Sequence, residues 1–233
     1  MTATLQAPVA PGSDIGEAFR AAYDNRYTWE PGFEGYRGRC VWEQDGRRIE
    51  GQFTVGADLK ATVEGVEDAE VKKAMASQLW EVAIHRVRRS FEQTHGANTF
   101  TAGDTDDVGT EVIVGGKNKG DRYRIKNNIV TMVYRHIHGT VVTIFTQSTT
   151  DTGCGYLSHT YSSRYSDPET GAAKGGINRF TDTFQPLPQP ASQGSAAASP
   201  WVLVERIIET DQSESEQQGG QQIFRFQDLK PLS

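Results

Sequence analysis

The chain has 233 residues, of which 36% are hydrophobic and 23% are charged, and its net charge is −6 at pH 7. This composition is typical of a globular protein with a hydrophobic core and excludes a chain that is disordered throughout. The mild acidic excess argues against a general affinity for nucleic acid. Two cysteines, Cys40 and Cys154, are too few and too far apart for a disulfide framework, so we expect reduced thiols.

No targeting or membrane-spanning segment is recognisable in the sequence. Residues 1–11 lack the basic region and apolar run of a secretory signal, and nowhere do about 18 apolar residues follow one another. We therefore expect a protein that works in the cytoplasm or on a membrane surface, with a disordered N-terminus over residues 1–12.

A short helix opens the folded part of the chain. Asp14 and Glu17 have the spacing of a capping box, in which each side chain bonds a free amide of the first turn. Apolar residues recur behind them at helical spacing, which predicts a helix over residues 14–24.

A β-hairpin follows from Phe33 onward. Its side chains alternate between two faces, and the face that carries Arg37 and Arg39 is predicted to be the exposed one. Asp45-Gly46 tolerates the positive φ angles of a tight hairpin turn of the primed type. Strands are therefore predicted over residues 33–42, 48–55 and 59–63.

The segment over residues 68–91 is predicted to be one long helix. Acidic residues crowd its start, and Arg86, Arg88 and Arg89 lie at its end, as the helix dipole favours. Its apolar residues sweep an arc of about 220°, whereas about 100° suffices for a helix on a flat sheet. A sheet that curves around the helix would cover this wide apolar surface.

The rest of the chain is predicted to be an antiparallel meander with two loops of unusual composition. Residues 186–200 form a low-complexity loop rich in Pro, Gln, Ser and Ala, and residues 210–221 form a polar loop. Asn127-Asn128 and Gly139-Thr140 are short turns. Strands are predicted over residues 98–102, 110–114, 122–126, 129–138, 141–147, 156–165, 175–184, 201–208 and 222–229.

These elements predict an α+β fold of one domain over residues 13–230. A large curved antiparallel sheet, an incomplete β-barrel, would wrap around one long helix, and a short helix would precede them. A separate domain after the low-complexity loop would have about 30 residues and would bury too little surface to fold.

Several short motifs, taken in their order along the chain, resemble a family of uncharacterised proteins from cyanobacteria and chloroplasts, the domain of unknown function 3386. The resemblance spans about residues 14–229. It also makes the chain similar to the half-barrels of the lipoprotein carriers LolA and LolB, which implies a curved sheet with an apolar cavity and a link to thylakoid membranes. It implies no catalytic residues. The motifs are Gly32-Phe33, Asp45-Gly46, Gly120-Asp121-Arg122-Tyr123, Gly155-Tyr156-Leu157, the run from Tyr165 to Gly171, and Ile223-Phe224-Arg225-Phe226.

Three histidines are candidates for a metal site. His136 and His138 lie two residues apart on a predicted strand and would face the same side, where two imidazoles can bind zinc or iron. His159, on a later strand, could supply a third ligand. No acidic partner or fixed spacing motif accompanies them, so surface or half-buried polar residues are the favoured interpretation.

Two further motifs are better explained by structure than by chemistry. Cys154 lies between two glycines, which could expose its thiol, but the sequence supplies no base to activate it. The run from Gly115 to Gly120 resembles a phosphate-binding loop, yet it lacks the closing Lys-Ser/Thr pair and the following helix. We predict a hairpin loop there.

A local basic strip stands out against the acidic background of the chain. It could contact anionic lipid head groups or an acidic protein surface, and a solvated strand face is the alternative. The strip consists of Lys117, Lys119, Arg122, Arg124 and Lys126.

The long helix supplies the candidates for a ligand cavity: Trp80, Ile84, Val87 and Phe91. A filled core is the alternative to a cavity. We favour a non-catalytic binding or assembly protein without a cofactor, which holds a lipid-like or pigment-like molecule or docks a membrane-associated protein. The alternatives are a tetrapyrrole-modifying or lyase-like β-barrel enzyme and a scaffold for protein interactions.

Overall fold

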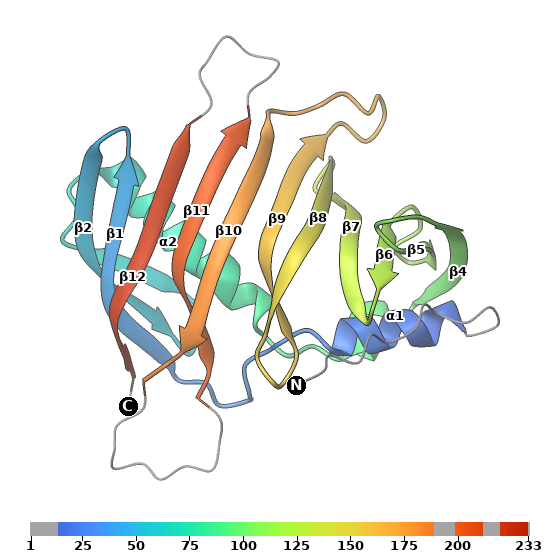
Figure 1. Ribbon diagram of the computed structural model, residues 1–233, viewed down its shortest axis with the longest axis horizontal. Helices are drawn as coiled ribbons and strands as arrows, with labels where there is room; N and C mark the ends of the chain where they lie inside the picture. The colour runs from blue at the N-terminus through green and yellow to red at the C-terminus, as the bar shows by residue number, and fades with distance from the viewer. Residues whose placement is uncertain (1–13, 189–198, 212–219, 233) are drawn as a thin grey trace. The chain divides into compact units, whose positions relative to one another are not determined.

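The computed structural model describes residues 14–188, 199–211 and 220–232 (Figure 1). The N-terminal residues 1–12, predicted to be disordered, lie outside these ranges, and so does most of each of the two predicted loops. Within the described residues, no helix combines the length and the apolar character needed to cross a membrane.

The described chain forms two compact units, and the chain passes between them more than once. Unit 1 is built from residues 14–27 and 89–178, whereas unit 2 contains residues 28–88, 179–188, 199–210 and 220–232. Both units consist mainly of antiparallel strands, which confirms the predicted antiparallel sheet. The prediction of a single domain over residues 13–230 stays a prediction.

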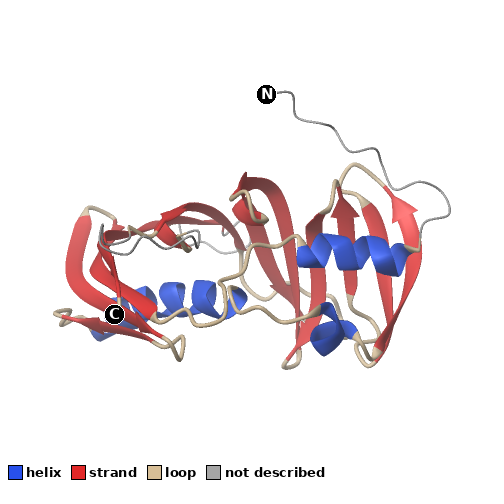
Figure 2. Ribbon diagram, turned by 90° about the horizontal axis from the view of Figure 1, so that it is seen from below, coloured by secondary structure: helices blue, strands red, loops and turns tan. Residues whose placement is uncertain are grey.

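Unit 1 is a six-stranded meander with two helices. Its strands lie in the order β9-β8-β7-β6-β5-β4, so each strand pairs with its neighbour in the sequence. Figure 2 shows these strands curving past α1 and the short helix α3. The elements are α1 (Ile15–Asp24), α3 (Phe91–His95), β4 (Asn98–Thr105), β5 (Thr110–Gly116), β6 (Arg122–Lys126), β7 (Ile129–Ile137), β8 (Thr140–Asp151) and β9 (Tyr156–Ser166).

The core of unit 1 forms where α1 packs on the sheet. Asp14 is the N-cap of α1, as predicted, and its carboxylate accepts a hydrogen bond from the Gly16 amide at 2.8 Å. Phe19 is fully buried, and its ring centroid lies 4.6 Å from that of Tyr123 on β6 and 5.5 Å from that of Phe91 on α3. The helix therefore covers one face of the strands.

Unit 2 has six strands and one helix. Its strands lie in the order β3-β2-β1-β12-β11-β10, and among the described residues β3 has a strand neighbour on one side only. The C-terminal strand therefore pairs with the first strand. The elements are β1 (Gly35–Gln44), β2 (Arg47–Gly56), β3 (Ala61–Glu64), α2 (Ala69–His85), β10 (Ile177–Pro186), β11 (Trp201–Asp211) and β12 (Gln221–Pro231).

The β1–β2 hairpin forms as predicted. Asp45 and Gly46 have φ angles of 51° and 76°, which are those of the predicted turn, and Gln44 pairs with Arg47 across it. Gly38 lies at a register shift between β1 and β12, where a side chain would come within 2.5 Å of the Gln227 carbonyl oxygen. Only glycine fits at that close approach.

A buried ion pair lies between α2 and the strands β10 and β11. Arg206 and Asp182 are each 2% exposed, and the guanidinium donates two hydrogen bonds of 2.7 and 2.6 Å to the carboxylate. Arg206 also donates to the amide oxygen of Gln78 on α2 at 2.9 Å. The bidentate contact between Arg206 and Asp182 compensates the two charges, which would otherwise be costly to bury.

The single long helix predicted over residues 68–91 is not confirmed. Helix α2 ends at His85, and a separate helix begins at Phe91 behind Ser90. The break has a local cause, because Ser90 and Gln93 form a capping box in which each side chain bonds the other residue's amide, at 3.1 and 2.9 Å.

The wide apolar arc predicted for this segment is not buried as a whole. Met75 and Leu79 are fully buried in unit 2, whereas Phe91 is buried in the core of unit 1, so the apolar residues serve two packing sites rather than one enclosed helix. The Trp80 side chain is 50% exposed, so part of the predicted buried arc faces solvent.

Candidate binding cleft on the outer face of unit 1

The strands β6 to β9 display two rows of side chains on the face opposite α1. On β6, Tyr123 and Ile125 are buried toward the core, and the alternation of a strand turns Arg122 and Arg124 to the other face. The strand register places Arg122 opposite Tyr134 on β7.

The first row continues from Tyr134 to Thr143 on β8 and then to Arg164 on β9, by the same register. The second row runs from Arg124 to Met132 on β7 and on to Phe145 on β8. The first row thus has an arginine at each end, and the second row has one at its start followed by two apolar side chains.

These two rows line a cleft of about 390 Å³. Met132 and Thr143, which are 7% and 4% exposed, lie deep in it, whereas Arg122 and Arg164 are exposed at its edge. The cleft therefore combines an apolar floor with a charged rim. Its lining residues are Asp106, Val108, Glu111, Arg122, Arg124, Met132, Tyr134, Thr143, Phe145 and Arg164.

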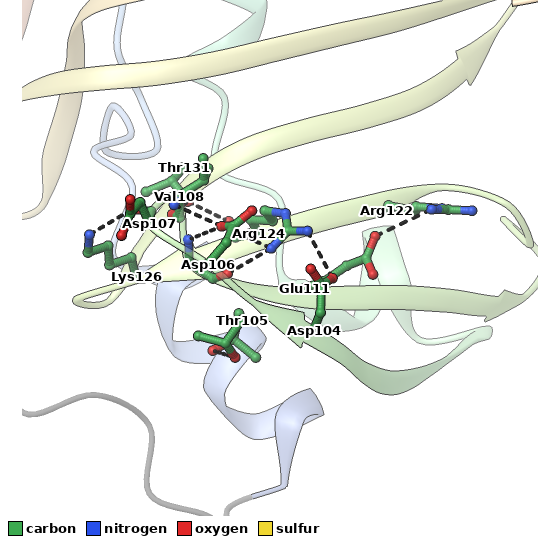
Figure 3. Close-up of polar contacts among 12 residues, drawn as sticks. Asp104, Thr105, Asp106, Asp107, Val108, Glu111, Arg122, Arg124, Lys126 and Thr131 are labelled. Atoms are coloured by element: carbon green, nitrogen blue, oxygen red, sulfur yellow. Dashed lines mark hydrogen bonds and ion pairs between the residues drawn. The ribbon is translucent and has the colours of Figure 1, made fainter.

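Arg124 fixes one wall of the cleft by holding the loop between β4 and β5 (Figure 3). Its guanidinium lies 2.9 Å from a carboxylate oxygen of Asp104 and 3.0 Å from one of Asp106, and it donates to the Gly109 carbonyl at 2.9 Å. The Arg124 side chain is only 13% exposed. Its charge is thus already compensated by Asp104 at the end of β4 and by Asp106 in the loop.

Two further contacts fasten the same loop to the sheet. The Thr131 hydroxyl donates to the Val108 carbonyl at 2.7 Å, and the Lys126 ammonium donates to the Asp107 carbonyl at 2.7 Å (Figure 3). The wall that Val108 contributes is therefore formed before any ligand arrives, which reduces the entropy lost on binding.

The other two arginines of the cleft are less fully paired. The Arg122 side chain is 56% exposed, and its guanidinium lies 3.5 Å from a carboxylate oxygen of Glu111 and 6.0 Å from the centroid of the Tyr134 ring. The Arg164 side chain makes no hydrogen bond or ion pair within the described part of the chain. Its donors are available to a ligand.

The predicted basic strip divides between the loop and the cleft. Lys117 and Lys119 lie in the turn between the antiparallel strands β5 and β6, which confirms a hairpin loop in place of a phosphate-binding loop. Of the three strand residues, Arg122 and Arg124 line the cleft.

The three candidate metal ligands are not brought together. His136 lies on β7, but His138 lies in the following turn with a φ of 47°, so the two do not share a strand face. His159 lies at a register shift in β9. Among residues 14–188, 199–211 and 220–232, no three His, Cys, Asp or Glu side chains cluster closely enough to hold a metal ion.

The candidate cavity residues of the predicted long helix fall into different surroundings. Trp80, Ile84 and Val87 belong to unit 2, and Trp80 is exposed, whereas Phe91 fills the core of unit 1 beside α1. Cys154 is exposed in the turn between β8 and β9. None of these residues lines the cleft.

Several cleft residues were not identified from the sequence: Met132, Tyr134, Thr143, Phe145 and Arg164. The alternation of β6 was a usable signal, since it turns Arg122 and Arg124 away from the core. The partners of those arginines depend on the register of four strands, and bulges shift that register between β6 and β7 and between β8 and β9.

A family model described as a protein of unknown function (DUF3386) matches residues 10–232. No curated protein matches the chain. Two solved structures align with it: a LolA superfamily protein from Nitrosomonas europaea, at 9% identity over 93% of each chain, and a DUF1329 family protein from Desulfovibrio piger, at 7% identity over 93% of this chain and 92% of that one. Their TM-scores are 0.30 and 0.26, too low to transfer a function.

Proposed function

We propose that this chain, which belongs to the DUF3386 family, is a non-catalytic binding protein whose cleft on unit 1 holds a hydrophobic ligand. The apolar floor of the cleft carries this proposal. Met132 and Phe145 lie side by side on β7 and β8, and Val108 adds a wall that the loop contacts hold in place. A volume of about 390 Å³ suits a small molecule.

The polar groups of the cleft favour binding over catalysis. The lining contains neither His nor Cys, and Glu111 and Asp106 are each paired with an arginine. A nucleophile with an adjacent base is what covalent catalysis requires, and no such pair lines this cleft. The charged groups are therefore better suited to orienting a ligand.

The resemblance to proteins of cyanobacteria and chloroplasts makes membrane lipids and pigments the first ligands to test. An apolar segment of a membrane-associated protein could occupy the same floor, so extraction has to distinguish a small molecule from a polypeptide. Mass spectrometry of the intact complex makes that distinction directly.

The proposal is tested by purifying the full chain and identifying what it carries. Native mass spectrometry and organic extraction should reveal a bound apolar molecule, either from the cell or taken up from lipid or pigment extracts. Phe145→Ala should reduce this load strongly, because it removes part of the floor. Ile137→Ala, which alters an exposed residue at the end of β7 outside the cleft, should not.

Two outcomes would count against a carrier role. One is a protein that is isolated without any apolar molecule and takes up none from the extracts. Alternatively, Phe145→Ala and the wild-type chain could carry equal loads, which would place the ligand elsewhere.

A tetrapyrrole-modifying enzyme is the second candidate, and one contact favours it. The His136 ring nitrogen Nδ1 lies 3.2 Å from a carboxylate oxygen of Asp121, which is 4% exposed, and this arrangement can orient an imidazole as a base. The same carboxylate oxygen accepts a hydrogen bond from the His136 amide at 3.0 Å, which serves structure equally well. Incubation with tetrapyrroles that yields no spectral change, or one that His136→Ala leaves intact, would remove this candidate.

A further inference from the structure

We propose that the cleft selects an anionic amphiphile, a molecule with one carboxylate or phosphate group on an apolar body, and that the anionic group lies between Arg122 and Arg164. This inference rests on the proposed function, because it concerns the same cleft and the same apolar floor. It adds the charge of the ligand and the residues that recognise it.

The first argument is the row of hydrogen-bond donors that crosses four strands. Arg122, Tyr134, Thr143 and Arg164 are successive register partners on β6, β7, β8 and β9, and all four line the cleft. Three strand spacings, about 14 Å, separate the two arginine Cα atoms. The two long side chains therefore flank the hydroxyl groups of the two residues between them.

The second argument is that these donors have little to bind within the chain. Neither hydroxyl of Tyr134 or Thr143 has a hydrogen-bond partner among the described residues, and Arg164 has none either. Arg122 has one carboxylate, Glu111, at 3.5 Å. A row of donors without acceptors is complementary to the oxygens of a carboxylate or phosphate.

The third argument is the charge balance of the lining. Arg124 is held by two carboxylates, and Arg122 is paired with Glu111. Arg164 is the one lining guanidinium without a carboxylate among the described residues. One anionic group would compensate it, whereas a neutral ligand would desolvate it without compensation and a cation would be repelled.

The apolar floor determines the rest of the ligand. Met132 and Phe145 form the parallel row beside the donors, so a head group between the two outer arginines places an attached chain over them. A small inorganic anion would use the donors but leave this floor uncovered. The combination therefore favours an amphiphile.

The test compares four decyl probes that differ only in head group, each used below its aggregation concentration. Calorimetry on the full chain should show that decanoate and decyl phosphate bind at least about tenfold more tightly than decanol, as charge-assisted hydrogen bonds require. Decyltrimethylammonium should bind most weakly. The ratio of decanoate to decyl phosphate affinity then separates a carboxylate from a phosphate head group.

Substitutions locate the anionic group. Arg164→Gln should weaken decanoate binding about tenfold and leave decanol binding unchanged, and Arg164→Lys should restore part of the loss. Arg89→Gln, an exposed arginine of the same unit outside the cleft, is the matched control and should change neither affinity. Because Arg164 is exposed and unpaired, its replacement should leave the melting temperature unchanged.

The two proposals fail in different ways. Equal affinities for decanol and decanoate, or a preference for decanoate that Arg122→Gln and Arg164→Gln both leave intact, would overturn the anionic head group but not the hydrophobic cleft. Failure of all four probes to bind, or binding that Phe145→Ala does not weaken, would overturn the cleft as the binding site itself.

Discussion

At the scale of single residues, the most unusual environment is that of His95 at the end of α3. Five aromatic rings surround its imidazole, with ring centroids between 5.1 and 6.1 Å away, and the residue is 5% exposed. Burial lowers the pKa of His95 to about 4 from its ordinary 6.5, and the charges of Arg135 and Arg26 act in the same direction. The folded protein therefore holds this histidine neutral.

This shift predicts a specific dependence of stability on pH. Between pH 6.5 and 4 the unfolded chain binds a proton at His95 that the folded chain does not, so the free energy of unfolding falls as the pH falls through that window. Above pH 6.5, His95 does not make the free energy of unfolding depend on pH. The loss should amount to about 3 kcal/mol by pH 4.

Urea denaturation at a series of pH values measures this effect. His95→Gln should flatten the dependence between pH 6.5 and 4, whereas His138→Asn, which replaces a histidine in an exposed turn, should leave the slope unchanged. An unchanged slope in His95→Gln would contradict the shift.

The buried pair of Arg206 and Asp182 makes a second prediction for single residues. Asp182→Ala leaves a buried guanidinium without its main partner and should lower the free energy of unfolding by about 3–5 kcal/mol. The double substitution Asp182→Leu with Arg206→Met removes both charges and should cost much less. Chemical denaturation of the wild-type chain and the two variants checks this order, and equal losses in the single and double variants would show that packing, not charge, stabilises the contact.

At the scale of elements, the break between α2 and α3 predicts whether a substitution at Ser90 stabilises or destabilises the protein. Ser90→Ala removes the N-cap of α3 and should destabilise the protein by about 1 kcal/mol. In one continuous helix over residues 68–91, the same change would stabilise, because alanine is the better helix former. Denaturation midpoints decide between the two, with Ser77→Ala on the exposed face of α2 as the control.

The sequence predicted most strands and turns because their signals are local. Asp45-Gly46 and Asn127-Asn128 all have the positive φ angles that these residues tolerate, and the strands end at such turns. The prediction of one long helix is wrong because helical spacing of apolar residues continues across residues 86–90, although Ser90 and Gln93 form a capping box that starts a new helix.

The cleft was less predictable, since it depends on pairing between distant segments. Arg122 and Arg124 were identified as a charged strand face, but Arg164 is forty residues or more from both, and only the register of β6 to β9 aligns them. Period-two alternation indicates the face on which a side chain lies, not its neighbour on the next strand.

At the scale of the whole molecule, the chain order of the two units constrains which fragments can fold. Unit 1 takes α1 from residues 14–27 and all its strands from residues 89–178, with a segment of unit 2 between them. A fragment of residues 89–178 alone would lack α1 and expose the core side chains that Phe19 covers.

We therefore expect the fragment of residues 89–178 to be poorly soluble or to lack fixed tertiary packing, with weak near-ultraviolet circular dichroism. Adding a peptide of residues 13–27 should restore part of the native signal, and the same peptide with Phe19→Ala should not. A fragment that folds fully without the peptide would show that α1 is dispensable to the core.

The pairing of β12 with β1 has a consequence for the newly made chain. On the ribosome, β1 emerges almost two hundred residues before β12, the strand that must lie against it. Cys40 and Trp42 therefore remain without their register partners Phe226 and Phe224 until β12 has been made. Unit 1 can close as soon as β9 has left the exit tunnel, whereas the sheet of unit 2 is completed only after β12 has followed it. A nascent chain arrested shortly before β12 would therefore present an open strand edge to chaperones and to its neighbours.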